Sequence, residues 1–115
     1  MVVGRATLLG PIDFGFGSLS LEQHPQLSLP RMTVRCIKKP IDKPGVIRLL
    51  EAVSTTLAHG QALTMLLDLR ACSLPSRAQL RLGQAWAREA WPQLETHLKG
   101  LAILLSGGMM RSTVN

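Results

Sequence analysis

The pattern of hydrophobic and polar residues changes near residue 30. Residues 1–30 are rich in glycine, proline and serine, and their apolar positions follow no regular period. Ala6 to Leu9 is apolar and predicts an edge strand, after which Gly10 and Pro11 indicate a turn. We expect this strand to be followed by a long loop or a weak hairpin, and we place the main domain at 31–115.

Regular periods begin after residue 30. Met32, Val34 and Cys36 alternate with more polar residues, which is typical of a half-buried strand. Over residues 44–59 the apolar positions recur at spacings of three and four, which predicts an amphipathic helix. Asp42 precedes this helix and is a suitable N-cap.

Two unbroken apolar runs follow, Leu63–Leu69 and Leu101–Leu105. Their length and their flanking turn residues predict two neighbouring parallel strands. An unbroken apolar run is also typical of a strand buried on both faces of a sheet. We therefore expect helices on both faces.

A long helix is predicted between these strands, from Arg77 to Leu98, with Ser76 as its N-cap. Pro92 should kink or divide it, because proline lacks a backbone donor and crowds the preceding turn. We expect Gly100 to close the helix. One apolar stripe at a spacing of four residues is expected to face the core: Leu82, Trp86, Ala90, Leu94 and Leu98.

The order strand, helix, strand, helix, strand predicts a small single-domain α/β fold, with a mixed or parallel sheet flanked by helices. After residue 105 a glycine turn leads into MMRSTVN, which we interpret as the start of a third helix. The sequence ends before that helix could be completed, so we expect its last helix to be truncated. Such a domain should dimerise, take up a partner element or expose apolar surface.

Charge and composition argue against several classes of protein. There are 13 basic and 7 acidic residues, a net charge of +6, but the basic residues are scattered and only 2 Phe, 2 Trp and no Tyr are present. This does not favour nucleic-acid binding. The 2 cysteines are expected to be free thiols, and the 3 histidines lie far apart, so we expect neither a metal nor a cofactor.

No apolar run reaches the ~20 residues of a membrane span. The N-terminus has no basic region followed by a continuous apolar stretch, as a secretory signal would have. We expect a cytoplasmic protein, while organelle targeting by the N-terminus stays open.

Four features occur together between Met32 and Asn115. The helix over 44–59 precedes the strand LTMLLDLR, and Asp68 ends that strand before a Pro/Ser loop. A long helix with Trp86 and Trp91 follows, and then LAILLSGGMMRSTVN. In these features the chain resembles the STAS family, specifically its anti-sigma-factor-antagonist-like branch.

The resemblance implies a four- or five-stranded sheet flanked by helices, which acts as a protein-binding or ligand-sensing module without catalysis. In regulated members of the family, a phosphorylatable Ser follows an Asp at the start of the helix after the central strand. That pair would fall near Ser76-Arg77, where this chain has no Asp-Ser. Ser73 and Ser76 are the candidate phosphorylation sites, and the alternative for Ser76 is a helix N-cap alone.

A ligand site is predicted at the carboxyl edge of the central strands, where α/β folds place their ligands. A glycine turn from a strand into a helix presents free N–H groups to an anion, although an ordinary turn explains the same residues. The candidate anion-binding residues are Asp68, Arg70, Gly107, Gly108, Arg111 and Ser112.

No matched nucleophile, base and orienting group is evident, and the nucleophile motif GxSxG is absent. We expect a non-enzymatic regulatory or protein-interaction module with a protein partner or a second copy. The alternative is a protein that binds a small anionic or lipid-like ligand, and a small hydrolase-type enzyme comes third. Trp91 is the candidate partner anchor, and partial burial at a helix kink is its alternative explanation.

Overall fold

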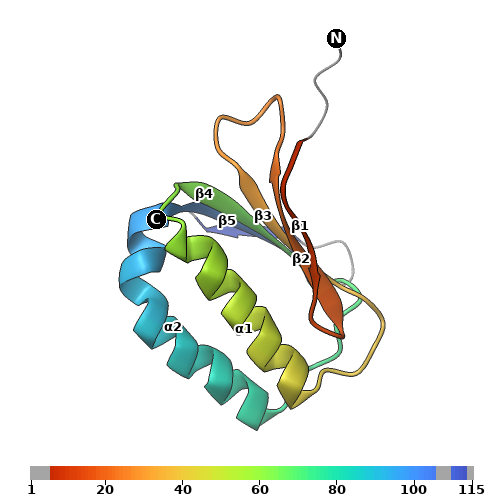
Figure 1. Cartoon of the computed structure of the whole chain (residues 1–115). Coiled ribbons are helices and arrows are strands. Elements are labelled where there is room, and N and C mark those ends of the chain that lie inside the picture. Colours follow the sequence, from red (N-terminus) through yellow and green to blue (C-terminus); the bar gives the residue numbers. More distant parts are fainter. Residues whose placement is uncertain (1–5, 106–109, 114–115) are drawn as a thin grey trace.

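A six-stranded sheet with two helices packed on one of its faces forms the framework of the described residues (Figure 1). This computed structural model describes residues 6–105 and 110–113, with side chains from 10 to 105. The elements are β1 (Ala6–Asp13), β2 (Gly17–Gln23), β3 (Arg31–Cys36), α1 (Lys43–Ala58), β4 (Leu63–Asp68), α2 (Arg77–His97), β5 (Leu98–Leu104) and β6 (Met110–Thr113).

The strands lie side by side in the order in which they occur in the sequence. β1, β2 and β3 form an antiparallel meander, β3, β4 and β5 are parallel, and β6 returns antiparallel to β5. The expected small α/β fold with a mixed sheet is therefore confirmed. So is the prediction that the two apolar runs form neighbouring parallel strands, since Met65 pairs with Leu101.

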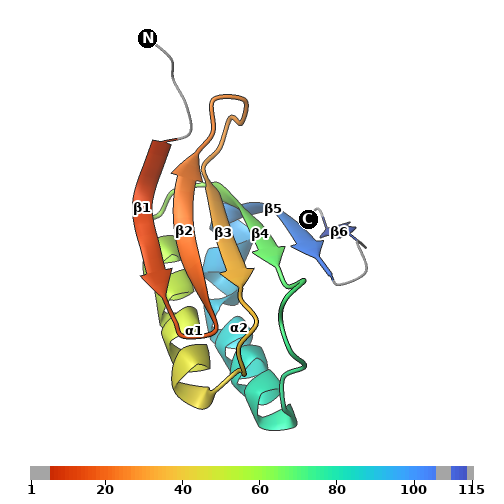
Figure 2. The same cartoon turned by 90° about the vertical axis from the view of Figure 1, so that its right-hand side faces the viewer.

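The expectation that helices cover both faces of the sheet is wrong for the part of the chain that the structure describes. The connections from β3 to β4 and from β4 to β5 both move to the next strand in the same direction across the sheet. Because such parallel connections are nearly always right-handed, both helices lie on the same face. Figure 2 shows both helices behind the sheet. Thr64 and Leu66 of β4 face the side without a helix and are only half-buried.

The N-terminal segment forms a hairpin, the second of the two predicted alternatives. The predicted turn at Gly10 and Pro11 is wrong, because both residues lie within β1, where the pairing with β2 is irregular between Leu9 and Ile12.

The turn of the hairpin is built by Asp13, whose carboxylate accepts a 2.7 Å hydrogen bond from the Gly15 N–H. Gly15 has a φ of 100°, a conformation that glycine adopts without strain. Phe14 and Phe16 on either side pack edge to face, with ring centroids 4.7 Å apart, and both are buried.

The first helix begins as the sequence predicts. Asp42 is the N-cap of α1, and its carboxylate accepts a 2.9 Å hydrogen bond from the Gly45 N–H. Pro44 lies in the first turn, where its missing N–H costs no helical hydrogen bond. The buried face of α1 includes Val53 and Leu57.

The second helix differs from the prediction at its C-terminal end. Pro92 lies inside one continuous helix rather than dividing it, and the helix ends at His97. Leu98 has an extended backbone and pairs with Leu63, so the chain passes directly from helix to strand. Gly100 therefore does not close the helix: it lies within β5, opposite Thr64.

The last described element corrects the prediction of a third helix. Met110–Thr113 forms β6, in which Arg111 pairs with Ile103 and Ser112 with Ala102. β5 is bonded to β4 on one edge only, so the backbone groups on its other edge need partners, and an antiparallel strand supplies them.

The fully buried part of the hydrophobic core lies mainly between α1 and the sheet. The predicted apolar stripe packs against it, with Ala90 buried and Leu82, Trp86, Leu94 and Leu98 half-buried. Of the 21 residues of α2, all of which the structure describes, only Ala90 is buried. The core residues come from the β1–β2 turn, β2, β3, β4 and α1: Phe14, Phe16, Leu19, Leu21, Met32, Val34, Cys36, Val46, Ala52, Val53, Leu57, Leu63 and Met65.

Candidate functional site

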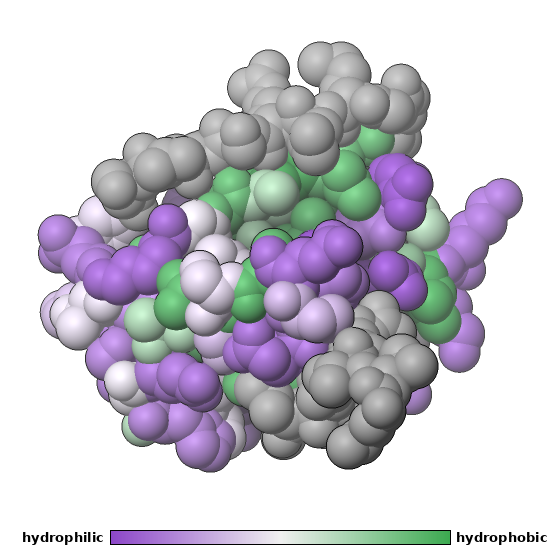
Figure 3. Space-filling model, turned by 90° about the horizontal axis from the view of Figure 1, so that it is seen from above, coloured by the Kyte–Doolittle hydropathy of each residue, from purple (hydrophilic) through white to green (hydrophobic). Residues whose placement is uncertain are grey.

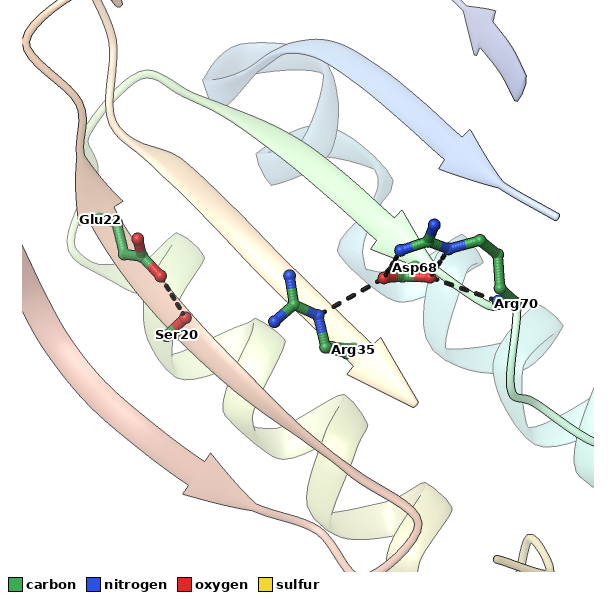
Figure 4. A network of polar contacts seen from close by, with 5 residues as sticks. All are labelled: Ser20, Glu22, Arg35, Asp68 and Arg70. Atoms are coloured by element: carbon green, nitrogen blue, oxygen red, sulfur yellow. Dashed lines mark hydrogen bonds and ion pairs between the residues drawn. The ribbon is translucent and has the colours of Figure 1, made fainter. Parts of the chain in front are cut away.

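Asp68 forms a polar site at the carboxyl end of β4 (Figure 4). Its side chain is 7% exposed and is bound by Arg70 through two parallel contacts. Arg70 Nε donates to Oδ1 at 2.9 Å and Arg70 Nη2 donates to Oδ2 at 2.8 Å. The Arg70 backbone N–H donates to Oδ1 at 3.3 Å. A two-point arginine–carboxylate pair of this kind fixes both side chains.

Arg35 approaches the same carboxylate from β3. Its Nε lies 3.4 Å from Asp68 Oδ2, and the two residues are direct cross-strand partners. The hydrogen bond from the Arg70 side chain lowers the pKa of Asp68 from 3.8 to about 2, and the positive charge of Arg35 acts in the same direction. Asp68 is thus ionised at neutral pH with both oxygens engaged, which does not suit a general base.

The predicted anion-binding residues are brought together only in part. Asp68 and Arg70 are in contact, as described above. Gly107 and Gly108 lie outside the described residues. Arg111 and Ser112 belong to β6, two strands away from β4, and the structure describes their backbone only.

The two candidate phosphorylation sites are both exposed. Ser76 is the N-cap of α2, as predicted: its hydroxyl accepts a 3.1 Å hydrogen bond from the Gln79 N–H, while the Gln79 side chain accepts a 2.8 Å bond from the Ser76 N–H. This reciprocal pair is a capping box. Phosphorylation at Ser73 or Ser76 stays a prediction.

An apolar groove lies between α1, α2, β4 and β5. The part of the groove beside the C-terminal half of α2 has a volume of about 430 Å³. Trp86 is half-buried in its wall, where its indole N–H donates a 2.6 Å hydrogen bond to the Ser54 hydroxyl of α1. The walls are formed by Val34, Leu49, Leu50, Val53, Met65, Leu67, Trp86, Trp91, Leu94, Leu98, Gly100 and Leu101.

The groove continues toward the start of α2 as a second space of about 600 Å³. The two parts share wall residues, among them Leu49, Leu50 and Leu67. At this end Leu74 is 95% exposed and Leu80 is 52% exposed. Seen from the opposite end, where both helices finish, apolar side chains gather between hydrophilic ones (Figure 3).

Trp91 lies at the rim of the groove and is 52% exposed. Trp91 is therefore exposed enough to contact a partner, and its role as a partner anchor stays a prediction. Sequence reasoning missed the groove, because the periodicity of α2 indicates which residues face the core but not that most of them stay half-buried there. The available indication was the small residues Gly83 and Ala87, which line the groove and leave space beside larger side chains.

No family model, no curated protein and no solved structure matches this chain. Among the helices of the described part, none combines the length and hydropathy needed to cross a membrane. Across residues 6–105 and 110–113, no three His, Cys, Asp or Glu side chains are grouped so that they could hold a metal ion.

Proposed function

We propose that this chain is a non-enzymatic binding module of the STAS-like kind, which takes an amphipathic helix of a partner protein into the apolar groove beside α2. The observation that carries the proposal is the low burial of α2: within this fully described helix only Ala90 is buried, while Trp91 and Leu80 are each 52% exposed at the groove. Fully burying one large apolar side chain contributes about 1.5–3 kcal/mol. A partner that covers these two residues gains a substantial part of that energy.

The charges beside the groove favour an acidic partner. Arg77, Arg81 and Arg88 are exposed on α2, and no acidic residue precedes Glu89 in that helix. Lys43 is exposed at the start of α1, which lies at the same end of the molecule (Figure 1). Opposite charges across an interface speed association and fix the orientation of the partner. The partner helix should therefore carry its acidic residues at the end that lies beside Arg77 and Arg81.

The polar site at β4 supports a non-enzymatic role. Asp68 is held by Arg70 in a two-point pair and has a pKa of about 2. A general base works best with a pKa near the operating pH. The pair instead fixes the end of β4 beside Arg35.

A small lipid-like ligand is the second candidate, favoured by the volume of the groove. The part of the groove beside the C-terminal half of α2, about 430 Å³, falls within the range of small-molecule sites, roughly 300–1,000 Å³. Its walls are almost entirely apolar, so it suits an acyl chain rather than a polar metabolite.

Two synthetic amphipathic peptides test the proposal. Both carry leucines at helical spacing, and one has acidic and the other basic polar positions. We expect the acidic peptide to bind more tightly in fluorescence anisotropy and to weaken as salt is added. Trp91→Ala should weaken binding about 30-fold, the equivalent of ~2 kcal/mol for an aromatic anchor that the partner buries. Leu27→Ala is the matched control, since Leu27 is 37% exposed and takes no part in the groove.

Equal, weak binding of both peptides would contradict the proposal, as would an unchanged affinity in Trp91→Ala. Saturable one-to-one binding of a fluorescent fatty acid without peptide binding would favour the lipid-like ligand instead. Sedimentation velocity in the absence of peptide tests whether a second copy of the chain fills the groove. If it does, the wild type sediments as a dimer and Trp91→Ala sediments as a monomer.

A further inference from the structure

The face of the sheet that carries no helix is polar where β2, β3 and β4 adjoin. Side chains at alternate positions of a strand point to the same face, and the strand register aligns them in rows across three strands. These rows are Ser18–Arg35–Asp68, Ser20–Thr33–Leu66 and Glu22–Arg31–Thr64. In Figure 4, Arg35 lies between Asp68 on one side and the β2 residues Ser20 and Glu22 on the other.

These rows enclose a small cavity of about 100 Å³, with Leu66 in its wall. That volume is well above the roughly 10–15 Å³ needed by one water molecule. Hydroxyl groups come from Ser18, Ser20 and Thr33, and guanidinium groups come from Arg31 and Arg35. The cavity is therefore lined mostly by hydrogen-bond donors.

One of these donors is buried without a hydrogen-bond partner within the described residues: the Nε of Arg31. Buried polar groups nearly always have such a partner, so this atom points to a ligand in the cavity. Thr33, which is 8% exposed, places its hydroxyl in the same cavity wall.

We propose that this cavity is a binding site for a phosphate group, held by Ser18, Thr33, Arg31 and Arg35. It lies on the opposite face of the sheet from the groove and does not depend on the proposed function. The single charge of Asp68 is shared between Arg70, which binds both of its oxygens, and Arg35, whose Nε lies 3.4 Å from Oδ2. Glu22 accepts a 3.1 Å bond from the Ser20 hydroxyl, and its charge offsets one of the two guanidinium groups in the cavity.

The number of donors selects phosphate over a carboxylate. Two hydroxyls and two guanidinium groups supply more hydrogen bonds than the two oxygens of a carboxylate can accept in this space. A tetrahedral phosphate presents its oxygens in several directions, and arginine donates to phosphate oxygens in charge-assisted hydrogen bonds. The same chemistry is offered by inorganic phosphate and by a phosphate monoester.

Titration of the ¹⁵N-labelled chain with inorganic phosphate, at constant ionic strength set by chloride, tests this site. We expect saturable shifts of the amide signals of β2 and β3. Arg35→Ala, which removes a side chain that is 64% exposed, should weaken binding at least tenfold. Thr33→Val, which keeps the shape and removes the donor, should weaken it several-fold. Arg48→Ala on α1 is the matched control and should leave the affinity unchanged.

Glycerol phosphate and acetate complete the experiment. If glycerol phosphate binds as tightly as inorganic phosphate, the site accepts a phosphate monoester. If the ester binds more weakly, the ligand of the site is free phosphate. Acetate binding as tightly as phosphate would overturn the proposal. So would shifts that never saturate, or equal affinities in Arg35→Ala, Thr33→Val and Arg48→Ala.

Discussion

The Trp86 indole N–H donates a 2.6 Å hydrogen bond to the hydroxyl of Ser54, and this bond connects α2 to α1 across the wall of the groove. Both side chains are half-buried. A second polar contact, the 2.9 Å hydrogen bond from the Gln79 side chain to the Ile41 carbonyl, also holds α2, a fully described helix whose only buried residue is Ala90.

Removing the acceptor of this bond should destabilise the domain. Ser54→Ala leaves the indole N–H without its partner, and we expect the free energy of unfolding to fall by about 1 kcal/mol in urea titrations. In a Trp86→Phe background the same substitution should have almost no effect, because the donor is already absent. Additive effects of the two substitutions would contradict the assigned bond.

Asp68 should make stability depend on acid pH. Its pKa is lowered to about 2 from 3.8, so the unfolded chain binds a proton more readily than the folded chain. The stabilisation is then complete above pH 4 and is lost as the pH falls toward 2. Asp68→Asn should be less stable than the wild type at pH 7, and the difference should shrink between pH 4 and pH 2. Glu51→Gln, at an exposed position of α1, is the control.

The two cysteines should differ in reactivity. Burial raises the pKa of Cys36 to about 12, and the neighbouring Cys72 thiol adds to the shift. Both cysteines adjoin the groove, but Cys36 is buried and Cys72 is only half-buried. At pH 8, iodoacetamide should modify Cys72 first and Cys36 only slowly, as followed by mass spectrometry. Urea should make the two rates similar, and equal rates in the native protein would contradict this placement.

Ser76 and Ser73 should differ in how much each contributes to the stability of the domain. Ser76→Ala removes the N-cap of α2 and should cost about 1 kcal/mol in the free energy of unfolding. Ser76→Asp should retain most of the stability, since aspartate caps helices well. Ser73→Ala should leave the urea midpoint unchanged, because Ser73 is exposed. An unchanged midpoint in Ser76→Ala would contradict the capping role.

Local patterns were sufficient to predict β3, α1, β4 and β5. Asp42 and Ser76 act as N-caps because a cap depends on only a few adjacent residues. The same patterns could not show that Leu82 and Trp86 remain half-buried, since that depends on how far α2 lies from the sheet.

The cavity on the open face was missed for a related reason. Alternating polar residues at Ser18 and Ser20, and at Thr33 and Arg35, were visible in the sequence. Only the register of the strands brings them into rows, and register depends on pairing between distant segments. The strand Met110–Thr113 likewise follows from the unpaired edge of β5 rather than from its own sequence.

Nuclear Overhauser effects between a bound acidic peptide and the methyl groups of the protein test the central proposal most directly. With a peptide whose leucines alone are labelled, we predict contacts to the methyls of Leu49, Leu94 and Leu101, which line the groove. Contacts confined to Leu66 on the opposite face of the sheet, or none at Leu94 and Leu101 when the peptide is saturating, would contradict the account.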